Sequence, residues 1–332
     1  MDAYKFPITA FGSILGTGGF ALASRPYIPI LVVPITIVLV ILFSIFSGIF
    51  LVKMVTHPDL VRSELNNPIT GNFYALQPIS AVVLAVLLWH LVPTAVSTGL
   101  LVYGAGLIFA LSIYLPYHFF SSVNVEFSQL HGGWFITPVA TILVTNAVLL
   151  YPSNEVTLII ALLFFGTGAT LFILVLSVLF FRLISHTLPP VELAPTNYIV
   201  LAPIGMLIVD VMQIARFANQ FIGTNVTTVF LLGAIALWGF GVWAIGVNLL
   251  LLVRYIRLGF KFHLGWWSFV FPTAAFTLGT VSLSEYLNSF RTLSLIVYSF
   301  LLVVFAIVVA GSLGQLINFF GKSQKSSLRL GQ

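Results

Sequence analysis

The sequence predicts an all-α integral membrane protein, with ten transmembrane helices arranged as five helical hairpins in quasi-five-fold order. Three observations predict this fold class. Of the 332 residues, 60% are hydrophobic and only 6% are charged. The apolar residues form long runs separated by short polar breaks. A proline recurs in the early part of every second run, which indicates a repeated hairpin.

The composition excludes several classes of protein. A soluble domain is about 25% charged, and 13 Lys and Arg with 8 Asp and Glu cannot cover a chain of this length in water. Soluble enzymes and nucleic-acid-binding proteins are therefore excluded, and the expected surroundings are a lipid bilayer. The chain has no cysteine, so neither disulfides nor a thiolate metal site are expected.

Ten apolar runs are each close to the roughly 20 residues that cross a bilayer as a helix. They lie at about 6–25, 28–53, 75–92, 94–117, 134–151, 156–182, 196–215, 226–254, 266–286 and 293–320. The breaks between them are too short for a second folded unit. Residues 1–332 are therefore predicted to form a single transmembrane channel or transporter domain, ending in a short basic cytoplasmic tail at 321–332.

The distribution of lysine and arginine predicts the orientation. With ten spans, both termini share one side with the loops that follow the second, fourth, sixth and eighth helices. That side carries ten basic residues: Lys5, Lys53, Arg62, Arg182, Arg254, Arg257, Lys261, Lys322, Lys325 and Arg329. The opposite side carries Arg25, Arg216 and Arg291. This asymmetry predicts a multi-pass protein of the cell membrane with both termini in the cytoplasm.

Five prolines spaced 60 to 71 residues apart mark the repeat. They are Pro7, Pro78, Pro138, Pro203 and Pro272, each in the early part of an odd-numbered helix. Small residues follow each proline, whereas the even-numbered helices are mostly leucine, valine, isoleucine and phenylalanine. Proline kinks and small residues are tolerated where a helix faces protein or a water-filled path. We therefore expect the odd-numbered helices to line a central pore, inside a lipid-facing outer ring.

Residues at the same distance from each proline are expected at similar depth. Phe6 and Phe271 both directly precede a proline, and their rings are candidates to close a narrow axis. The predicted lining consists of small or polar side chains: Gln77, Thr137, Thr141, Thr145, Asn146, Ala202, Asp210, Thr277 and Thr280. Thirteen residues after the proline a helix has climbed about 20 Å. Arg216 and Glu285 lie at that distance, so the outer mouth is expected to carry Arg216 with Arg25 and Arg291.

This predicted path is poor in charge, since Asp210 is its one formal charge. A pore that passes anions quickly must hold them weakly, and the dipoles of hydroxyl groups and helix N-termini suit that purpose. The basic residues at both mouths would enrich anions nearby. The three outer arginines equally fit the role of anchoring helix ends among the lipid headgroups.

Asp210 is an ionisable residue inside a predicted span, where such residues are usually functional. Three roles are open for it. The first is to relay protons in a coupled carrier. The second is to pair with Arg216 six residues further on, and the third is to hydrogen-bond a polar neighbour outside the path.

The sequence contains no motif of a known enzyme class. HExxH, GxSxG and a phosphate-binding loop are all missing. The histidines show no metal-ligand spacing. We therefore expect neither an enzyme nor a bound cofactor or metal.

Several segments resemble the tellurite-resistance/dicarboxylate transporter family, which includes bacterial tellurite-resistance channels, fungal malate and sulfite exporters and the plant slow-type anion channel. They span nearly the whole chain: Phe6-Pro7, Phe11-Gly12, Leu15-Gly16-Thr17, His57-Pro58, Trp134-Phe135 with Pro138, Leu193-Ala194-Pro195-Thr196, Leu201-Ala202-Pro203, Gly265-Trp266-Trp267 and Phe271-Pro272. The last of them, GWWSFVFP, is the most specific.

The resemblance implies a ten-helix quasi-five-fold pore, assembled as a homotrimer with one pore in each subunit. It also implies that a phenylalanine of the ninth helix closes the pore and moves aside to let anions through. By motif this residue corresponds best to Phe271, with Phe276 as the second option.

Two functions follow as hypotheses. The first is a gated channel of the cell membrane that conducts small inorganic or organic anions passively, through a charge-poor pore closed by Phe271. The second is a secondary exporter of C4-dicarboxylates, sulfite or tellurite-related oxyanions, coupled to protons through Asp210.

Overall fold

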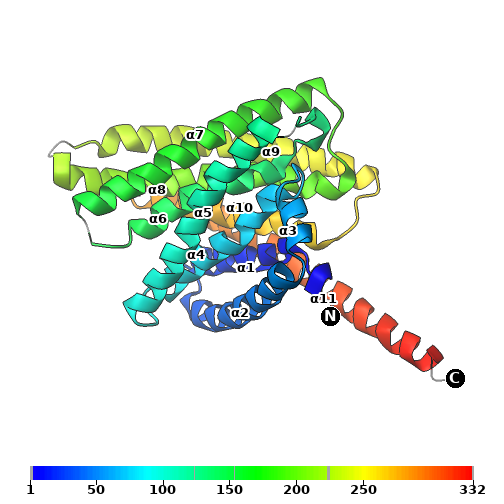
Figure 1. Cartoon of the computed structure of the whole chain (residues 1–332). Coiled ribbons are helices and arrows are strands. Elements are labelled where there is room, and N and C mark those ends of the chain that lie inside the picture. Colours follow the sequence, from blue (N-terminus) through cyan, green and yellow to red (C-terminus); the bar gives the residue numbers. More distant parts are fainter. Residues whose placement is uncertain (1–2, 123, 153, 223–224, 331–332) are drawn as a thin grey trace.

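The computed structural model describes every residue except 1–2, 123, 153, 223–224 and 331–332, and it describes no side chain at 220–222 or 318–330 (Figure 1). The described residues form α-helices and short 3-10 helices, with no strand among them. The α-helices are α1 (Phe11–Ser24), α2 (Val32–Thr56), α3 (Pro58–Leu65), α4 (Leu76–Leu88), α5 (Thr94–Ser122), α6 (Ile136–Val148), α7 (Glu155–Ser185), α8 (Leu201–Ile222), α9 (Thr227–Arg257), α10 (Trp267–Ser284) and α11 (Ser289–Leu330). In the predicted basic tail, the side chains of Lys322, Lys325 and Arg329 lie outside the described residues.

The protein is all-helical and has the helices of a multi-pass membrane protein. Within the described chain, seven helical segments are long and apolar enough to cross a membrane: Pro29–Thr56, Gly71–Leu88, Thr94–Ser122, Glu155–Ser185, Val191–Asn219, Thr227–Arg257 and Ser289–Ile317. Two further apolar segments, Ile8–Ser24 and Gly132–Val148, are shorter. The integral membrane class therefore agrees with the prediction, whereas the count of ten spans stays a prediction.

The helices α1, α4, α6, α8 and α10 form the buried centre. Every residue of α4 and all but two of α6 are buried. Contacts between these five helices run in a closed cycle: α1 packs on α4, α4 on α6, α6 on α8, α8 on α10, and α10 on α1. We refer to them as the inner helices.

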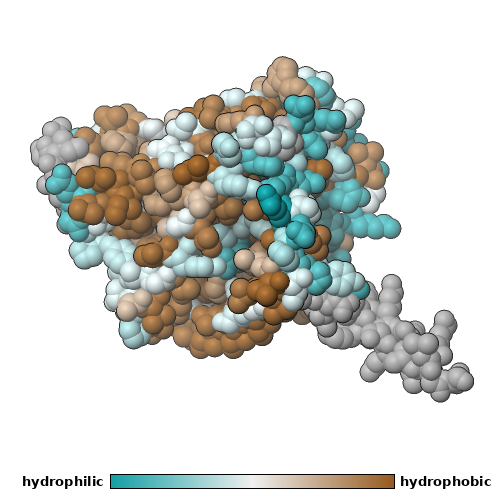
Figure 2. Space-filling model, viewed as in Figure 1, coloured by the Kyte–Doolittle hydropathy of each residue, from teal (hydrophilic) through white to brown (hydrophobic). Residues whose placement is uncertain are grey.

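Each inner helix packs on the long helix that follows it in the chain, which pairs α1 with α2, α4 with α5, α6 with α7, α8 with α9, and α10 with α11. These outer helices expose large apolar side chains, among them Ile37, Val102, Ile173, Leu250 and Val303, all more than half exposed. Figure 2 shows the resulting apolar surface. In water such a surface would be costly, whereas lipid is its natural solvent.

Each inner helix is preceded by a 3-10 helix, and three of the five repeated prolines lie just after this junction. The 3-10 helices are η2 (Ile8–Ala10), η4 (Gly71–Ala75), η6 (Gly132–Phe135), η7 (Val191–Val200) and η8 (Leu264–Trp266).

The repeated prolines stand mainly at helix starts. Pro78, Pro138 and Pro203 are each the third residue of their α-helix, Pro7 precedes η2, and Pro272 lies inside α10. We expected all five to kink their helices. In the first turn, however, an N–H has no partner within an α-helix. At Pro78, Pro138 and Pro203 the proline therefore begins a helix rather than bends one.

Two glycines of the outer helices show that the repeat extends to side-chain packing. Gly104 of α5 lies against the Pro78 carbonyl of α4, and Gly168 of α7 lies against the Pro138 carbonyl of α6. A Cβ atom added at these glycines would come 2.7 Å and 3.2 Å from the two carbonyl oxygens. Two successive hairpins therefore use the same close contact, which only a very small residue allows.

Gly205 of α8 marks a close approach between two inner helices. A Cβ atom at this position would overlap the backbone of Ala275 and Phe276 in α10. A backbone cannot move aside as a flexible side chain can, so the two helices would have to separate.

We predict that Gly205→Ala lowers the free energy of unfolding by about 2 kcal/mol or more, because overpacking forces α8 and α10 apart. The matched control is Gly233→Ala on α9, where a Cβ atom meets open space; there we expect a change below about 1 kcal/mol. Thermal unfolding in detergent, followed by circular dichroism, measures both. Equal melting temperatures for the two variants would contradict the close packing of α8 on α10.

Candidate pore

A cavity of about 670 Å³ opens among the N-terminal ends of the inner helices. Its wall includes Leu15 of α1, Leu76 of α4, Val139 of α6, Ile199 of η7 and Phe271 of α10. We call it the inner cavity, since it lies at the end of the molecule that the distribution of basic residues assigns to the cytoplasm.

The inner cavity combines an apolar wall with the positive ends of several helix dipoles. Each helix N-terminus carries about half a positive charge on its unpaired N–H groups, and the starts of the inner helices converge here. The titratable side chains among the described wall residues are Glu64, Glu192 and His263. Burial lowers the pKa of His263, and the carboxylate of Glu192 partly opposes this shift.

Glu64 is neutralised by a buried lysine. The Nζ atom of Lys53 lies 2.9 Å from both carboxylate oxygens of Glu64 and donates to the Phe6 carbonyl at 3.2 Å. The Tyr74 hydroxyl donates to the same carboxylate at 2.7 Å. Lys53 is only 2% exposed. This cluster joins the chain before α1 to α2, α3 and η4, and it removes a negative charge from the wall of the inner cavity.

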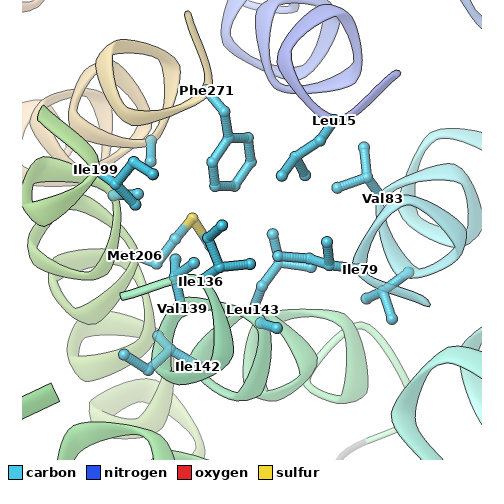
Figure 3. Close-up of a cluster of buried hydrophobic side chains, with 14 of the residues drawn as sticks. Leu15, Ile79, Val83, Ile136, Val139, Ile142, Leu143, Ile199, Met206 and Phe271 are labelled. Atoms are coloured by element: carbon cyan, nitrogen blue, oxygen red, sulfur yellow. The ribbon is translucent and has the colours of Figure 1, made fainter. Parts of the chain in front are cut away.

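Beyond the inner cavity, apolar side chains close the space between the inner helices. Figure 3 shows them turned toward one another, and each is at most 6% exposed: Leu15, Ile79, Val83, Val139, Leu143, Ile199, Met206 and Phe271. We call this set the apolar constriction. A constriction of this kind excludes water and therefore ions.

The apolar constriction follows the repeat, although Phe271 is the one member that the sequence pointed to. Ile79 and Val139 stand one residue after the repeated proline of their helix, and Val83 and Leu143 stand five residues after it. A spacing of four residues keeps both side chains on one face of a helix. The pattern was therefore present in the sequence, but apolar residues at a spacing of four do not stand out in a chain that is mostly apolar.

Phe271, the predicted gate residue, lies in the apolar constriction. It is 5% exposed and also forms part of the wall of the inner cavity. Its ring packs on α1 at Gly19, where an added Cβ atom would lie 2.8 Å from Cδ2 of the ring. The ring therefore stands at the boundary between the open cavity and the closed path.

The other two predicted gate residues face outer helices. Phe6 packs edge-on against Phe46 of α2, with ring centroids 5.4 Å apart. Phe276 stacks on Trp238 of α9 at 6.0 Å, and its ring fills the space beside Gly241 of the same helix. Neither belongs to the wall of the inner cavity.

Three predicted lining residues bond to outer helices. Gln77 donates to Ser47 of α2 at 3.4 Å and accepts from Tyr103 of α5 at 3.1 Å. Thr145 donates to the Ala161 carbonyl of α7 at 3.3 Å. Thr280 accepts from the Trp238 indole of α9 at 3.1 Å. These side chains therefore point away from the apolar constriction.

The remaining predicted lining residues are also held by neighbours or buried. Thr141 and Thr277 donate to the carbonyl four residues earlier in their own helix. Thr137 donates to Asn72 at 2.8 Å, Asn146 donates to Gln213 of α8 at 3.0 Å, and Ala202 is fully buried. Within the described chain, the wall of the inner cavity contains none of the nine predicted lining residues.

Asp210 is fully buried in α8, and neither carboxylate oxygen has a hydrogen-bond partner among the described residues. The expected pairing with Arg216 is not observed. Arg216 instead forms an ion pair with Glu285 at 3.1 Å, with both side chains about half exposed. An unpaired carboxylate inside an apolar protein is stable only when it is protonated or when a partner is supplied.

The three arginines of the predicted outer mouth have different surroundings. Arg216 bridges α8 to Glu285 at the end of α10. Arg25 donates to the Val86 carbonyl near the end of α4 at 3.1 Å. Arg291 is exposed near the start of α11. Two of these residues therefore join the ends of neighbouring helices.

His131 and His263 cap the 3-10 starts of two inner helices. Their Nδ1 atoms accept from the N–H groups of Gly133 and Gly265 at 3.0 Å and 3.1 Å. Burial lowers the pKa of His131 to about 4, so its ring is neutral and able to accept. Among the described residues, no group of three or more His, Cys, Asp or Glu side chains is placed to hold a metal ion.

The helical core with its cavity and closed path is that of a multi-pass membrane transport protein. The sequence model of the voltage-dependent anion channel family, SLAC1, matches residues 5–313. The chain belongs to this family, and the resemblance found in the sequence is thereby confirmed.

Known relatives support transport rather than catalysis. Two uncharacterized transporters of Methanocaldococcus jannaschii are each 28% identical to this chain, over 84% and 80% of it and 86% and 80% of their own lengths. The sulfite efflux pump SSU1 of Arthroderma otae is 23% identical, over 90% of this chain and 86% of its own.

We predict that Glu64→Gln lowers the free energy of unfolding by about 2 kcal/mol, because it leaves the buried ammonium of Lys53 without a counter-charge. The control is Asp59→Asn, a similar loss of one negative charge at an exposed position of α3, which is expected to be nearly neutral. Denaturant unfolding in detergent measures the difference. If Glu64→Gln is as stable as Asp59→Asn, the Lys53–Glu64 pair does not stabilise the wall of the inner cavity.

Proposed function

We propose that this protein is a gated anion channel of the cell membrane, in which Phe271 is the movable part of the apolar constriction. The observation that carries the proposal is the position of its ring, with the open inner cavity on one side and the closed path on the other. A rotation of the Phe271 side chain into the adjoining inner cavity would take its ring out of the apolar constriction.

In this proposal the five inner helices and the five outer helices cross the membrane as five hairpins around a quasi-five-fold axis. The closed cycle of contacts between the inner helices supports this arrangement, as does the pairing of each with its outer helix. Both termini lie in the cytoplasm, since ten of the thirteen lysines and arginines belong to that side. The channel assembles as a homotrimer, as the family resemblance implies.

In this proposal the pore selects anions through the weak positive electrostatic potential of helix N-termini rather than through an anion-binding site. The helix starts around the inner cavity present N–H groups to an entering ion, and Glu64 is neutralised by Lys53. No lysine or arginine belongs to the apolar constriction, so nothing there would hold an anion tightly. Small inorganic or organic anions are the proposed substrates, and sulfite, named for the fungal relative, is the first to test.

A second candidate function is a secondary exporter of sulfite, C4-dicarboxylates or tellurite-related oxyanions, coupled to protons. The observation that favours it is Asp210, fully buried without a hydrogen-bond partner among the described residues. A carboxyl group that binds and releases a proton during each cycle would couple anion movement to the proton gradient.

We predict that Phe271→Ala raises anion conductance by about tenfold or more, since removing the ring lowers the barrier in the apolar constriction by at least about 1.4 kcal/mol. Purified protein in planar bilayers with asymmetric chloride measures it, and the mutant currents are expected to reverse near the chloride potential.

The matched control for this experiment is Phe276→Ala. It removes the same ring from the same helix but at the contact with α9, so it should leave conductance near the wild-type level while lowering stability by about 3 kcal/mol. A folded Phe271→Ala protein with unchanged conductance would rule out Phe271 as the gate.

For the exporter we predict saturable, pH-dependent sulfite flux into liposomes that Asp210→Asn abolishes, because the amide cannot bind and release a proton. Glu285→Gln serves as the control, because Glu285 is a half-exposed carboxylate at the C-terminal end of α10. This variant is expected to retain the flux. Flux that Asp210→Asn leaves unchanged would exclude proton coupling through Asp210.

A further inference from the structure

A groove of about 280 Å³ lies between the outer helices α7 and α9, at the end of the molecule where both helices end. Its wall is mostly apolar and includes Leu176 and Phe180 of α7 and Phe240 and Val247 of α9. Phe180 and Trp243 at its rim are about half exposed. We call it the α7–α9 groove. A groove open to the side between lipid-facing helices is accessible from the bilayer.

A buried guanidinium group faces this groove. Arg182 of α7 forms part of its wall and is only 2% exposed. Its Nε atom donates to the Phe127 carbonyl at 2.8 Å, whereas its Nη1 atom is buried without a hydrogen-bond partner among the described residues. The described wall of the groove contains no Asp or Glu. A buried positive charge without a counter-charge is costly, so this position requires an anion.

A second donor lies in the same groove. Asn197 of η7 forms part of the wall, and its Nδ2 atom is buried without a hydrogen bond to any described residue, although it lies near the Tyr255 hydroxyl. The groove therefore offers the unused Nη1 donor of Arg182, together with the Asn197 amide near the Tyr255 hydroxyl and a long apolar wall. A free inorganic anion would use the donors but would gain nothing from the wall.

We propose that the α7–α9 groove binds one anionic phospholipid from the leaflet on the N-terminal side of the protein. The phosphate lies at Arg182 and Asn197, because arginine pairs with phosphate oxygens through two parallel hydrogen bonds. One acyl chain lies along the apolar wall between α7 and α9. The lipid thus supplies the charge that the chain does not.

A neighbouring groove shows what makes this site selective. The cavity between α5 and α7, of about 170 Å³, has an apolar wall with the unused donors Asn72 Nδ2 and Trp134 Nε1. Asn72 and Asn197 each stand six residues before a repeated proline. The described wall of the α5–α7 cavity has no charged residue. Preference for an anionic lipid is therefore expected only beside Arg182.

The test is a titration of delipidated protein with phosphatidylglycerol or phosphatidylcholine, followed by native mass spectrometry, which reports both bound lipid and oligomeric mass. Wild-type protein is expected to bind one phosphatidylglycerol about tenfold more tightly than phosphatidylcholine. Arg182→Gln should remove this preference. Arg254→Gln, the loss of an exposed positive charge at the end of α9, should retain it.

Two further variants keep the test decisive if Arg182→Gln folds poorly. Arg182→Lys retains the charge but not the planar fork, and should weaken phosphatidylglycerol binding less than Arg182→Gln. Val247→Trp fills the apolar wall and should weaken binding of both lipids while Arg182 is intact. Circular dichroism checks the folding of each variant.

Three results would overturn the proposal. They are equal affinity of the wild-type protein for the two lipids, unchanged phosphatidylglycerol binding after Arg182→Gln, and unchanged binding after Val247→Trp. A change of oligomeric mass in Arg182→Gln without loss of lipid would instead assign the α7–α9 groove to contact between subunits. Displacement of the lipid by inorganic phosphate alone would assign it to a free anion.

Discussion

The first N–H groups of the inner helices must find partners in the interior of the protein, and much of the structure follows from this constraint. Each inner helix begins as a 3-10 helix, which satisfies some of these groups early. A proline in the first turn of α4, α6 and α8 brings no N–H that needs a partner. His131 and His263 accept two more. The starts of the inner helices surround the inner cavity, so their remaining N–H groups add positive potential to its wall.

In the proposed channel, the region that attracts anions and the region that closes the path lie at different depths. The positive helix ends belong to the inner cavity, and the apolar constriction beyond it offers an ion no partner at all. An ion that has lost its water there faces a barrier set by the apolar side chains rather than by a binding site. Phe271 belongs to both regions, as do Leu15, Val139 and Ile199, and it contributes the one aromatic ring among them, so in the proposed channel its movement changes the barrier most.

The sequence predicts which segments are helical and which residues share a level, but not which way each side chain points. Arg216 and Glu285 were expected at one level and form an ion pair. Thr141 and Thr277 were expected to line the path, and their hydroxyl groups donate to the carbonyl four residues earlier in the helix, a use of the hydroxyl that the spacing does not predict. The sequence likewise does not show that Phe276 faces an outer helix, since this follows from its stacking on Trp238, and Phe271 as the gate stays a proposal. The spacing of the prolines predicts how deep each residue lies. The direction of a side chain depends on the rotation of its helix, which is set by contacts between residues far apart in the chain.

Two of the basic residues that predict the orientation are buried and have structural partners. Their part in predicting the orientation can be separated from their part in the packing. Lys53 and Arg182 both count toward the basic side, yet each is only 2% exposed. Lys53 pairs with Glu64, and Arg182 bonds the Phe127 carbonyl beside the α7–α9 groove. Leaving both out still gives eight basic residues on one side against three on the other. The predicted orientation therefore does not depend on Lys53 and Arg182. The buried positions of these two residues need another explanation. Lys53 has its counter-charge within the chain. Arg182 lacks one in the described wall of the α7–α9 groove, and the proposed anionic lipid would supply it.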